Sequence, residues 1–273
     1  MSENYNNSSA EHDELKRSLS NRHLQLIAIG GAIGTGLFMG SGKTISLAGP
    51  SILVIYMIIG FMVFLVMRAL GELLLSNLQY KSFIDFATDL IGPWAGYFVG
   101  WTYWLCWITI GIADLSAIIY YLQFFNNGLP FSPEEGVMIS IASIVFIIGL
   151  NLVTVKLFGE MEFWFALVKI IAIVVLIAVG LWMIFTGFTS DAGTVASFSH
   201  IWDHGGIFPT GAMGFLAGFQ IAIFAFVGVE LVGTTAAETK DPEKNLPKAV
   251  NSIPIRIIIF YVLSLVMIMS VTP

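Results

Sequence analysis

The sequence predicts an all-α, polytopic membrane protein, and three observations lead to this prediction. Hydrophobic residues make up 57% of the chain and charged residues only 11%, whereas soluble domains carry about 25% charged residues. Apolar stretches recur along the chain, each close to the roughly 20 residues that one helical crossing of a bilayer needs. Two of these stretches contain clusters of glycines at the depth where a membrane helix would be continuous.

The N-terminal residues differ from the rest. Residues 1–20 are polar and rich in Asn, Ser and Glu, a composition that favours a disordered tail over a packed core. We expect no cleaved signal peptide in this tail. The membrane domain is expected to occupy residues 21–273.

About seven spans follow the tail, at roughly 20 apolar residues for each crossing. They are expected at residues 24–48, 51–70, 94–125, 136–152, 163–188, 210–235 and 253–271. The third is long for one crossing, so we expect it to be tilted or to extend beyond the bilayer, and the fourth is short.

Basic residues fall on one side of these spans. That side carries Lys16, Arg17, Arg22, Arg68, Lys81, Lys156, Lys240, Lys244, Lys248 and Arg256. The opposite loops carry Lys43 together with Glu134, Glu135, Asp191 and Asp203. Because loops rich in Lys and Arg stay in the cytoplasm, the N-terminus is predicted to be cytoplasmic.

The glycine clusters lie in residues 30–38 (GGAIGTGLF) and 224–233 (FAFVGVELVG). A glycine inside a helix costs about 1 kcal/mol relative to alanine, and an unpaired backbone group in hydrocarbon costs more still. Interrupted helices therefore persist at membrane depth where the freed backbone groups line a cavity. Two such interruptions at corresponding positions of two repeats indicate the substrate site of a secondary transporter. Close helix packing is the alternative explanation for single glycines.

Other functions find little support in the residues. Gly42-Lys43-Thr44 matches the last three residues of the phosphate-binding loop motif. That motif also requires a glycine five residues before Gly42, and this position is Leu37. The spans contain no metal-ligand cluster and no paired nucleophile and base. We therefore expect no enzymatic activity, no metal, no cofactor and no nucleic-acid partner.

Four stretches carry a family resemblance: LIAIGGAIGTGLFMGSGKTISLAGPSI, GWTYWLCW, GEMEFWFALVKI and AFVGVELVGTTAAETKDPEKNLPKAVNSIPIRI. They resemble the amino acid permeases of the amino acid–polyamine–organocation superfamily, and most closely those that carry D-serine, D-alanine and glycine. The resemblance implies a LeuT-like fold of two inverted five-helix repeats, with helices one and six broken. The first repeat would occupy about 24–188 and the start of the second about 210–273, so the chain would be truncated after about seven spans.

The resemblance also implies a function, which is proton-coupled uptake of small neutral amino acids across the cytoplasmic membrane. The partners would be the amino acid, the proton and the lipid bilayer, and the oligomeric state is left open. The alternative is a truncated fragment that does not transport, or that serves as an assembly partner, because helices that normally surround the site would be missing.

A zwitterionic substrate needs an anion site and a cation site close together, and a broken helix offers both. The amides of Thr35 and Gly36, helped by the Thr35 hydroxyl, are expected to hold the carboxylate. The backbone carbonyls of Ala32, Phe224 and Val227 are expected to hold the ammonium. The Phe224 ring is expected to cover the substrate, with ordinary packing as the alternative. Matched to the family pattern, the expected substrate-binding residues are Ala32, Ile33, Gly34, Thr35, Gly36, Phe224, Val227 and Gly228.

Three ionisable residues inside the spans are candidates for proton coupling or gating, since such residues are expensive to insert and commonly functional. In related permeases a lysine at the position of Lys169 takes the place of a sodium ion; snorkelling to the interface is the alternative. Glu230 lies at the second interruption, where it could instead bond freed amides, and Asp114 lies in the third span. Arg68 and Glu72, four residues apart, are expected to form a structural pair.

Overall fold

The computed structural model describes residues 30, 33–80, 82–152, 155–190, 193–231 and 241–272. Within these ranges the chain is built from helices, and the extended pairing is limited to an isolated bridge between Thr189 and Val195. The prediction of an all-α fold is confirmed. The N-terminal tail and several of the basic residues used to predict the topology, among them Lys81 and Lys240, lie outside the described ranges.

The first part of the chain forms one long helical run. It consists of α2 (Thr35–Phe38), α3 (Gly40–Ala48), the 3-10 turn η1 (Gly49–Ser51) and α4 (Ile52–Ser76). At the turn Gly49 has φ +59°, and a Cβ there would overlap Cγ of Pro209. Glycine is therefore required here by both its conformation and the close approach. The predicted first and second spans are joined at this turn without a loop.

The central part consists of α5 (Phe83–Leu90), α6 (Pro93–Leu122) with η2 (Gln123–Asn126), α7 (Pro133–Asn151) and α8 (Val155–Thr186). Of the described helices, α8 with 32 residues and α6 with 30 are the longest. Helices α5 and α7 both begin with a capping box, in which Ser82 pairs with Asp85 and Ser132 with Glu135. These reciprocal bonds satisfy backbone amides that a helix start leaves free.

The last part begins with the short helix α9 (His200–Asp203), followed by α10 (Gly211–Ala222) and the 3-10 turn η3 (Ile223–Phe226). It continues with α12 (Pro242–Asn251), α13 (Ile253–Arg256), the π-helix η5 (Ile257–Leu263) and α14 (Ser264–Val271). The α9 loop is fastened to the end of α14, since the Ser270 carbonyl accepts from the Ser197 amide at 2.9 Å.

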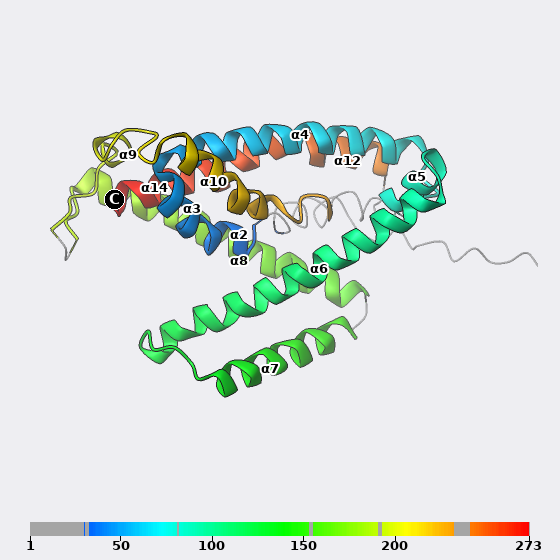
Figure 1. Ribbon diagram of the computed structural model, residues 1–273, viewed down its shortest axis with the longest axis horizontal. Coiled ribbons are helices and arrows are strands. Elements are labelled where there is room, and N and C mark those ends of the chain that lie inside the picture. Colours follow the sequence, from blue (N-terminus) through cyan, green and yellow to red (C-terminus); the bar gives the residue numbers. More distant parts are fainter. Residues whose placement is uncertain are drawn as a thin grey trace, which may run out of the picture.

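The helices divide into a packed body and a projecting pair (Figure 1). In the body, α4 packs against α12, α10 packs against α3, and α14 packs against α8. Its core includes the fully buried side chains of Ile52, Ile55, Tyr56 and Leu265. Helices α6 and α7 run side by side and project beyond this body, while α6 also contacts α2 through Asp114 and Thr35. Both helices expose most of their apolar side chains, which fits a lipid or protein environment on that side.

Within the described ranges, five helical runs are long and apolar enough to cross a membrane: Thr35–Ser76, Pro93–Asn126, Pro133–Asn151, Glu160–Thr186 and Pro242–Val271. Their ends agree with the predicted third, fourth and fifth spans to within a few residues. The first two predicted spans fall in one run, and the sixth corresponds to the shorter apolar helix Gly211–Phe226. The count of seven spans stays a prediction, because parts of the first and sixth lie outside the described ranges.

Candidate substrate site at two helix interruptions

The first interruption lies at Ile33 and Gly34, immediately before α2. Gly34 is extended, with φ −137° and ψ −164°, and helical structure starts at Thr35. The first amide that bonds within this turn is that of Leu37, which donates to the Gly34 carbonyl at 3.1 Å. The amides of Thr35 and Gly36 thus belong to the turn that a helix start leaves without intrahelical acceptors. Met39 has helical dihedrals (φ −93°, ψ −44°), so the half-helix continues into α3.

The second interruption follows η3. Val227 is extended, with φ −65° and ψ 137°, and Gly228 has φ +99°. A positive φ of this kind is readily adopted by glycine and rarely by other residues. The helix of the predicted sixth span therefore ends at Phe226, at the place that the glycine pattern indicated.

The two interruptions pack directly against each other. A Cβ placed on Gly36 would lie 2.5 Å from Cα of Ala225, 2.6 Å from its backbone nitrogen and 2.6 Å from the carbonyl oxygen of Phe224. All three neighbours are backbone atoms, so no side chain could rotate to make room. By contrast, a Cβ on Gly34 would meet no atom of the described residues within 4 Å. Gly36 is therefore a packing residue, and Gly34 borders open space.

Thr35 is held by a residue from the third span. Its hydroxyl donates to Oδ1 of Asp114 at 2.7 Å, and both residues are partly buried. The hydroxyl was expected to help hold the substrate carboxylate, but in this structure it is engaged with Asp114. The contact joins α2 to α6 directly beside the first interruption.

Lys169 contacts the other flank of the first interruption. Its Nζ donates to the Gly30 carbonyl at 3.1 Å, and a Cβ on Gly30 would overlap Cβ of Ala166, one turn earlier in α8. The ammonium also interacts electrostatically with Asp114 and Glu162. Glu162 was not predicted to take part, although its spacing of seven residues from Lys169 places both on one face of α8. Lys169 thus lies beside the first interruption.

Glu230 folds back onto the second interruption. Its Oε2 accepts from the Gly228 amide at 2.9 Å, so the carboxylate satisfies a backbone group that the break frees. This is the structural contact that was considered as the alternative to gating. Tyr103 of α6 interacts electrostatically with Glu230 and packs edge-to-face on Trp107, with ring centroids 6.0 Å apart. The third span therefore contributes to the surroundings of both interruptions.

Tyr261 is a further residue at the second interruption that the sequence did not indicate. Its hydroxyl donates to the Ala225 carbonyl at 3.0 Å, and its ring stacks on Phe226 with centroids 5.0 Å apart and planes 12° apart. The only signal in the sequence is a tyrosine within an apolar span, which does not reveal a partner 36 residues away.

The remaining predicted residues differ in how they can contribute. Ala32 lies outside the described residues. Ile33 is buried in the core, with 1% of the residue exposed. Phe224 is partly buried, and its carbonyl accepts from the Val227 amide at 3.4 Å. That bond is long, so the oxygen retains capacity for a second donor.

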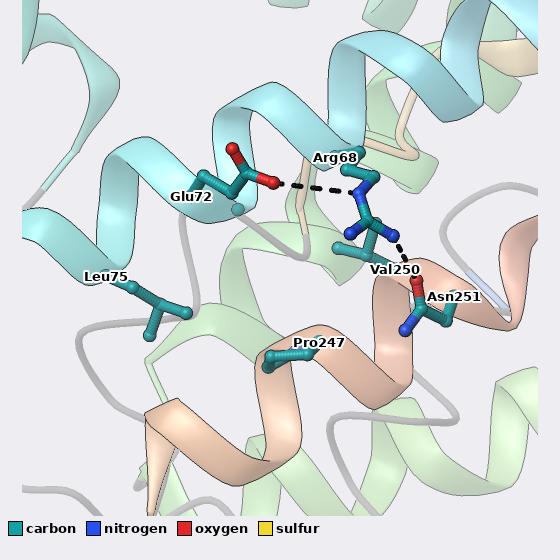
Figure 2. Close-up of a pocket in the computed structure, with 7 residues that line it drawn as sticks. Arg68, Glu72, Leu75, Pro247, Val250 and Asn251 are labelled. Atoms are coloured by element: carbon teal, nitrogen blue, oxygen red, sulfur yellow. Dashed lines mark hydrogen bonds and ion pairs between the residues drawn. The ribbon is translucent and has the colours of Figure 1, made fainter.

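A separate pocket of about 140 Å³ lies between α4 and α12 (Figure 2). On its rim, Nε of Arg68 lies 3.6 Å from Oε1 of Glu72, and the guanidinium also donates to Oδ1 of Asn251 at 3.3 Å. The predicted pairing of Arg68 with Glu72 is confirmed, and Asn251 extends it across to α12. The pocket contains none of the predicted substrate-binding residues.

Gly42, Lys43 and Thr44 lie within α3 rather than in a loop after a strand. Thr44 is fully buried, and its hydroxyl donates to the Gly40 carbonyl one turn earlier at 2.9 Å. A phosphate-binding loop instead presents free backbone amides to the phosphate. The helical geometry supports the rejection of a nucleotide site.

The chain matches the amino acid permease family pattern over residues 23–273. It is 69% identical to the D-serine/D-alanine/glycine transporter of Escherichia coli (strain K12) over 259 residues. The matched region covers 95% of this chain and 54% of that protein. It is 52% identical over 263 residues to the amino-acid permease AapA of Bacillus subtilis (strain 168), covering 96% of this chain and 56% of the relative.

A third relative is the aromatic amino acid transport protein AroP of E. coli (strain K12), which is 45% identical over 263 residues, or 96% of this chain and 55% of the relative. The chain thus spans about half the length of the curated relatives it matches. These matches, together with apolar helices long enough to cross a bilayer, identify a multi-pass membrane protein. The chain belongs to the amino acid permease family.

Proposed function

We propose that this chain forms the N-terminal half of a proton-coupled permease that imports small neutral amino acids, namely D-alanine, D-serine and glycine. The observation that carries the proposal is the contact between the two interrupted helices at Gly36 and Ala225. It brings the first amides of one half-helix next to the carbonyls of the other. The substrate class is taken from the E. coli D-serine/D-alanine/glycine transporter, with which this chain shares 69% identity.

Substrate recognition would rest mainly on backbone atoms. The amides of Thr35 and Gly36, at the positive end of the half-helix, would bind the carboxylate. The carbonyls of Phe224 and Val227 would accept from the ammonium. The open space beside Gly34 leaves room for a small side chain, because nothing lies within 4 Å of its Cβ position.

Proton coupling would depend on Lys169. A protonated Lys169 donates to the Gly30 carbonyl at 3.1 Å, so loss of its proton would remove a positive charge from the flank of the substrate site. Asp114 connects the same place to Thr35. The charge on Lys169 and the geometry of the first interruption would therefore depend on each other, which is the linkage that coupled transport requires.

The proposal also includes the cellular location and the orientation. The permease would lie in the cytoplasmic membrane with its N-terminus inside. The exposed Lys244 and Lys248 of α12 would then face the cytoplasm, as the positive-inside rule requires.

Uptake of labelled D-alanine and glycine tests the function. The test protein is a completed permease, in which residues 1–273 are joined to the C-terminal remainder of the E. coli transporter and expressed in transport-deficient cells. We expect accumulation that a proton ionophore abolishes, and loss of that accumulation in Lys169→Ala. Lys248→Ala, which removes an exposed lysine from α12, is the matched control and should accumulate substrate normally.

Uphill uptake that survives Lys169→Ala would reject the coupling role. Absence of uptake by the wild-type completed permease, with the protein shown to be in the membrane, would reject the transport proposal. Residues 1–273 expressed alone separate the second candidate, a non-transporting fragment or assembly partner. Uptake by this chain alone would exclude that candidate, since it would show that the C-terminal part of the relatives is not required.

A further inference from the structure

We propose that Tyr261 is a positioning residue for substrate binding, which acts by holding the backbone of the second interruption through the Ala225 carbonyl. The inference rests on the proposed function, because it assumes that this backbone contacts the substrate. Tyr261 does not itself belong to the predicted binding residues, and its effect is transmitted through η3.

The contact is made in the interior of the helix bundle. Tyr261 is 2% exposed and Ala225 is 2% exposed. The hydroxyl donates to the carbonyl at 3.0 Å, a distance normal for a hydrogen bond. Because water is excluded, this bond is electrostatically stronger than it would be at the surface, and the carbonyl would be left unsatisfied without it. The stacking of Tyr261 on Phe226 fixes the next residue of η3 as well.

The helix that carries Tyr261 is distorted at this residue. Residues Ile257–Leu263 form a π-helix, with regular α-helix on both sides. A π-helical turn inserts an additional residue and so rotates the side chains that follow, and such turns are frequent at functional sites. Here the distortion coincides with the one side chain of η5 that bonds to the second interruption.

The bonded carbonyl lies at the centre of the candidate site. The backbone of Ala225 is the surface against which Gly36 packs. Ala225 is flanked by Phe224, whose carbonyl is proposed to bind the substrate ammonium, and it is two residues before Val227. A shift of Ala225 would move these carbonyls relative to the amides of the first interruption. Tyr261 therefore controls the distance between the two halves of the site.

Tyr56 provides a matched control in the same cluster. It is fully buried, its ring centroid lies 5.4 Å from that of Phe226 and 5.8 Å from that of Tyr261, and its hydroxyl has no hydrogen-bond partner among the described residues. Tyr56→Phe and Tyr261→Phe each remove one buried hydroxyl from the same aromatic cluster. Only the second removes a bond to the interruption.

Uptake kinetics in the completed permease test the proposal. For Tyr261→Phe we expect the KM for D-alanine to rise about fivefold, the effect of losing one ordinary hydrogen bond, while Vmax per inserted molecule changes by less than about twofold. Tyr56→Phe should leave KM unchanged. A purely structural role would instead lower the amount of inserted protein and leave KM at its wild-type value, and that result would overturn the proposal.

A labelling measurement keeps the test independent of transport. Val229 is 4% exposed and lies just beyond the second interruption, so Val229→Cys in a Cys106→Ser background reports on opening there. In membranes containing residues 1–273, Tyr261→Phe should raise the thiol-labelling rate about fivefold, and Tyr56→Phe should not. Equal rates in both variants would refute the positioning role, even if the completed permease proved unable to transport.

Discussion

Replacement of Gly36 by alanine tests how closely the two interrupted helices approach. The added methyl carbon would lie 2.5 Å from Cα of Ala225 and 2.6 Å from the carbonyl oxygen of Phe224, whereas carbon atoms in contact are normally about 3.5–4.0 Å apart. Because the obstructing atoms are backbone, relief requires the half-helices to separate. Overpacking of this kind costs about 1–3 kcal/mol.

Gly42→Ala is the matched control, since it lies in the same half of the first span. A Cβ at Gly42 would meet nothing within 4 Å, and the residue is inside α3. Alanine is favoured over glycine in a helix interior by about 1 kcal/mol. The same chemical change is therefore expected to have opposite effects on the free energy of unfolding at the two positions.

The assay is thermal unfolding of detergent-extracted chain, together with the amount of protein inserted into membranes. At about 2–4 °C for each kcal/mol in a chain of this size, a loss near 2 kcal/mol lowers the melting temperature of Gly36→Ala by about 4–8 °C. Gly42→Ala should melt at the wild-type temperature or above it. Equal melting temperatures for the two variants would show that the first and sixth segments are not in backbone contact, and the reasoning about the site would fail with them.

Two further predictions concern the third span and the topology. Thr35→Val and Asp114→Ala should each raise the KM for D-alanine in the completed permease, because each removes the hydrogen bond between these two side chains. The double variant should be no worse than the more affected single variant, since both remove one contact; additive effects would contradict this. In a Cys106→Ser background, a membrane-impermeant thiol reagent applied to intact cells should label Asp203→Cys but not Lys248→Cys until the cells are permeabilised. The reverse pattern would place the N-terminus outside.

The sequence was sufficient to predict the fold class and the positions of both interruptions. The length of an apolar stretch predicts a helix in a bilayer, because every backbone group must be paired within the span. Clustered glycines indicate where the helix is interrupted and backbone groups are left unpaired by it. Gly34 and Gly228 therefore lie where the helices were expected to break. The contact between Arg68 and Glu72 was also predictable, since residues four apart share a helix face.

Contacts between distant spans were not predictable in the same way. The partner of Thr35 is 79 residues away in the chain, and that of Lys169 is 139 residues away. Helical periodicity says which face a residue occupies, but not which other helix covers that face. Tyr261 was missed for this reason, and the engagement of the Thr35 hydroxyl with Asp114 was not anticipated.

The approach of Gly36 to Ala225 also has a mechanical consequence. Most contacts between membrane helices are made by side chains, which can change rotamer and so absorb a displacement of one helix against another. Here the contact is between main-chain atoms, which have no rotamers to change, and packed interiors transmit strain rather than yield. A motion that displaces the first segment must therefore displace the sixth with it, so in the proposed transport cycle the two half-helices would move as a single rigid unit.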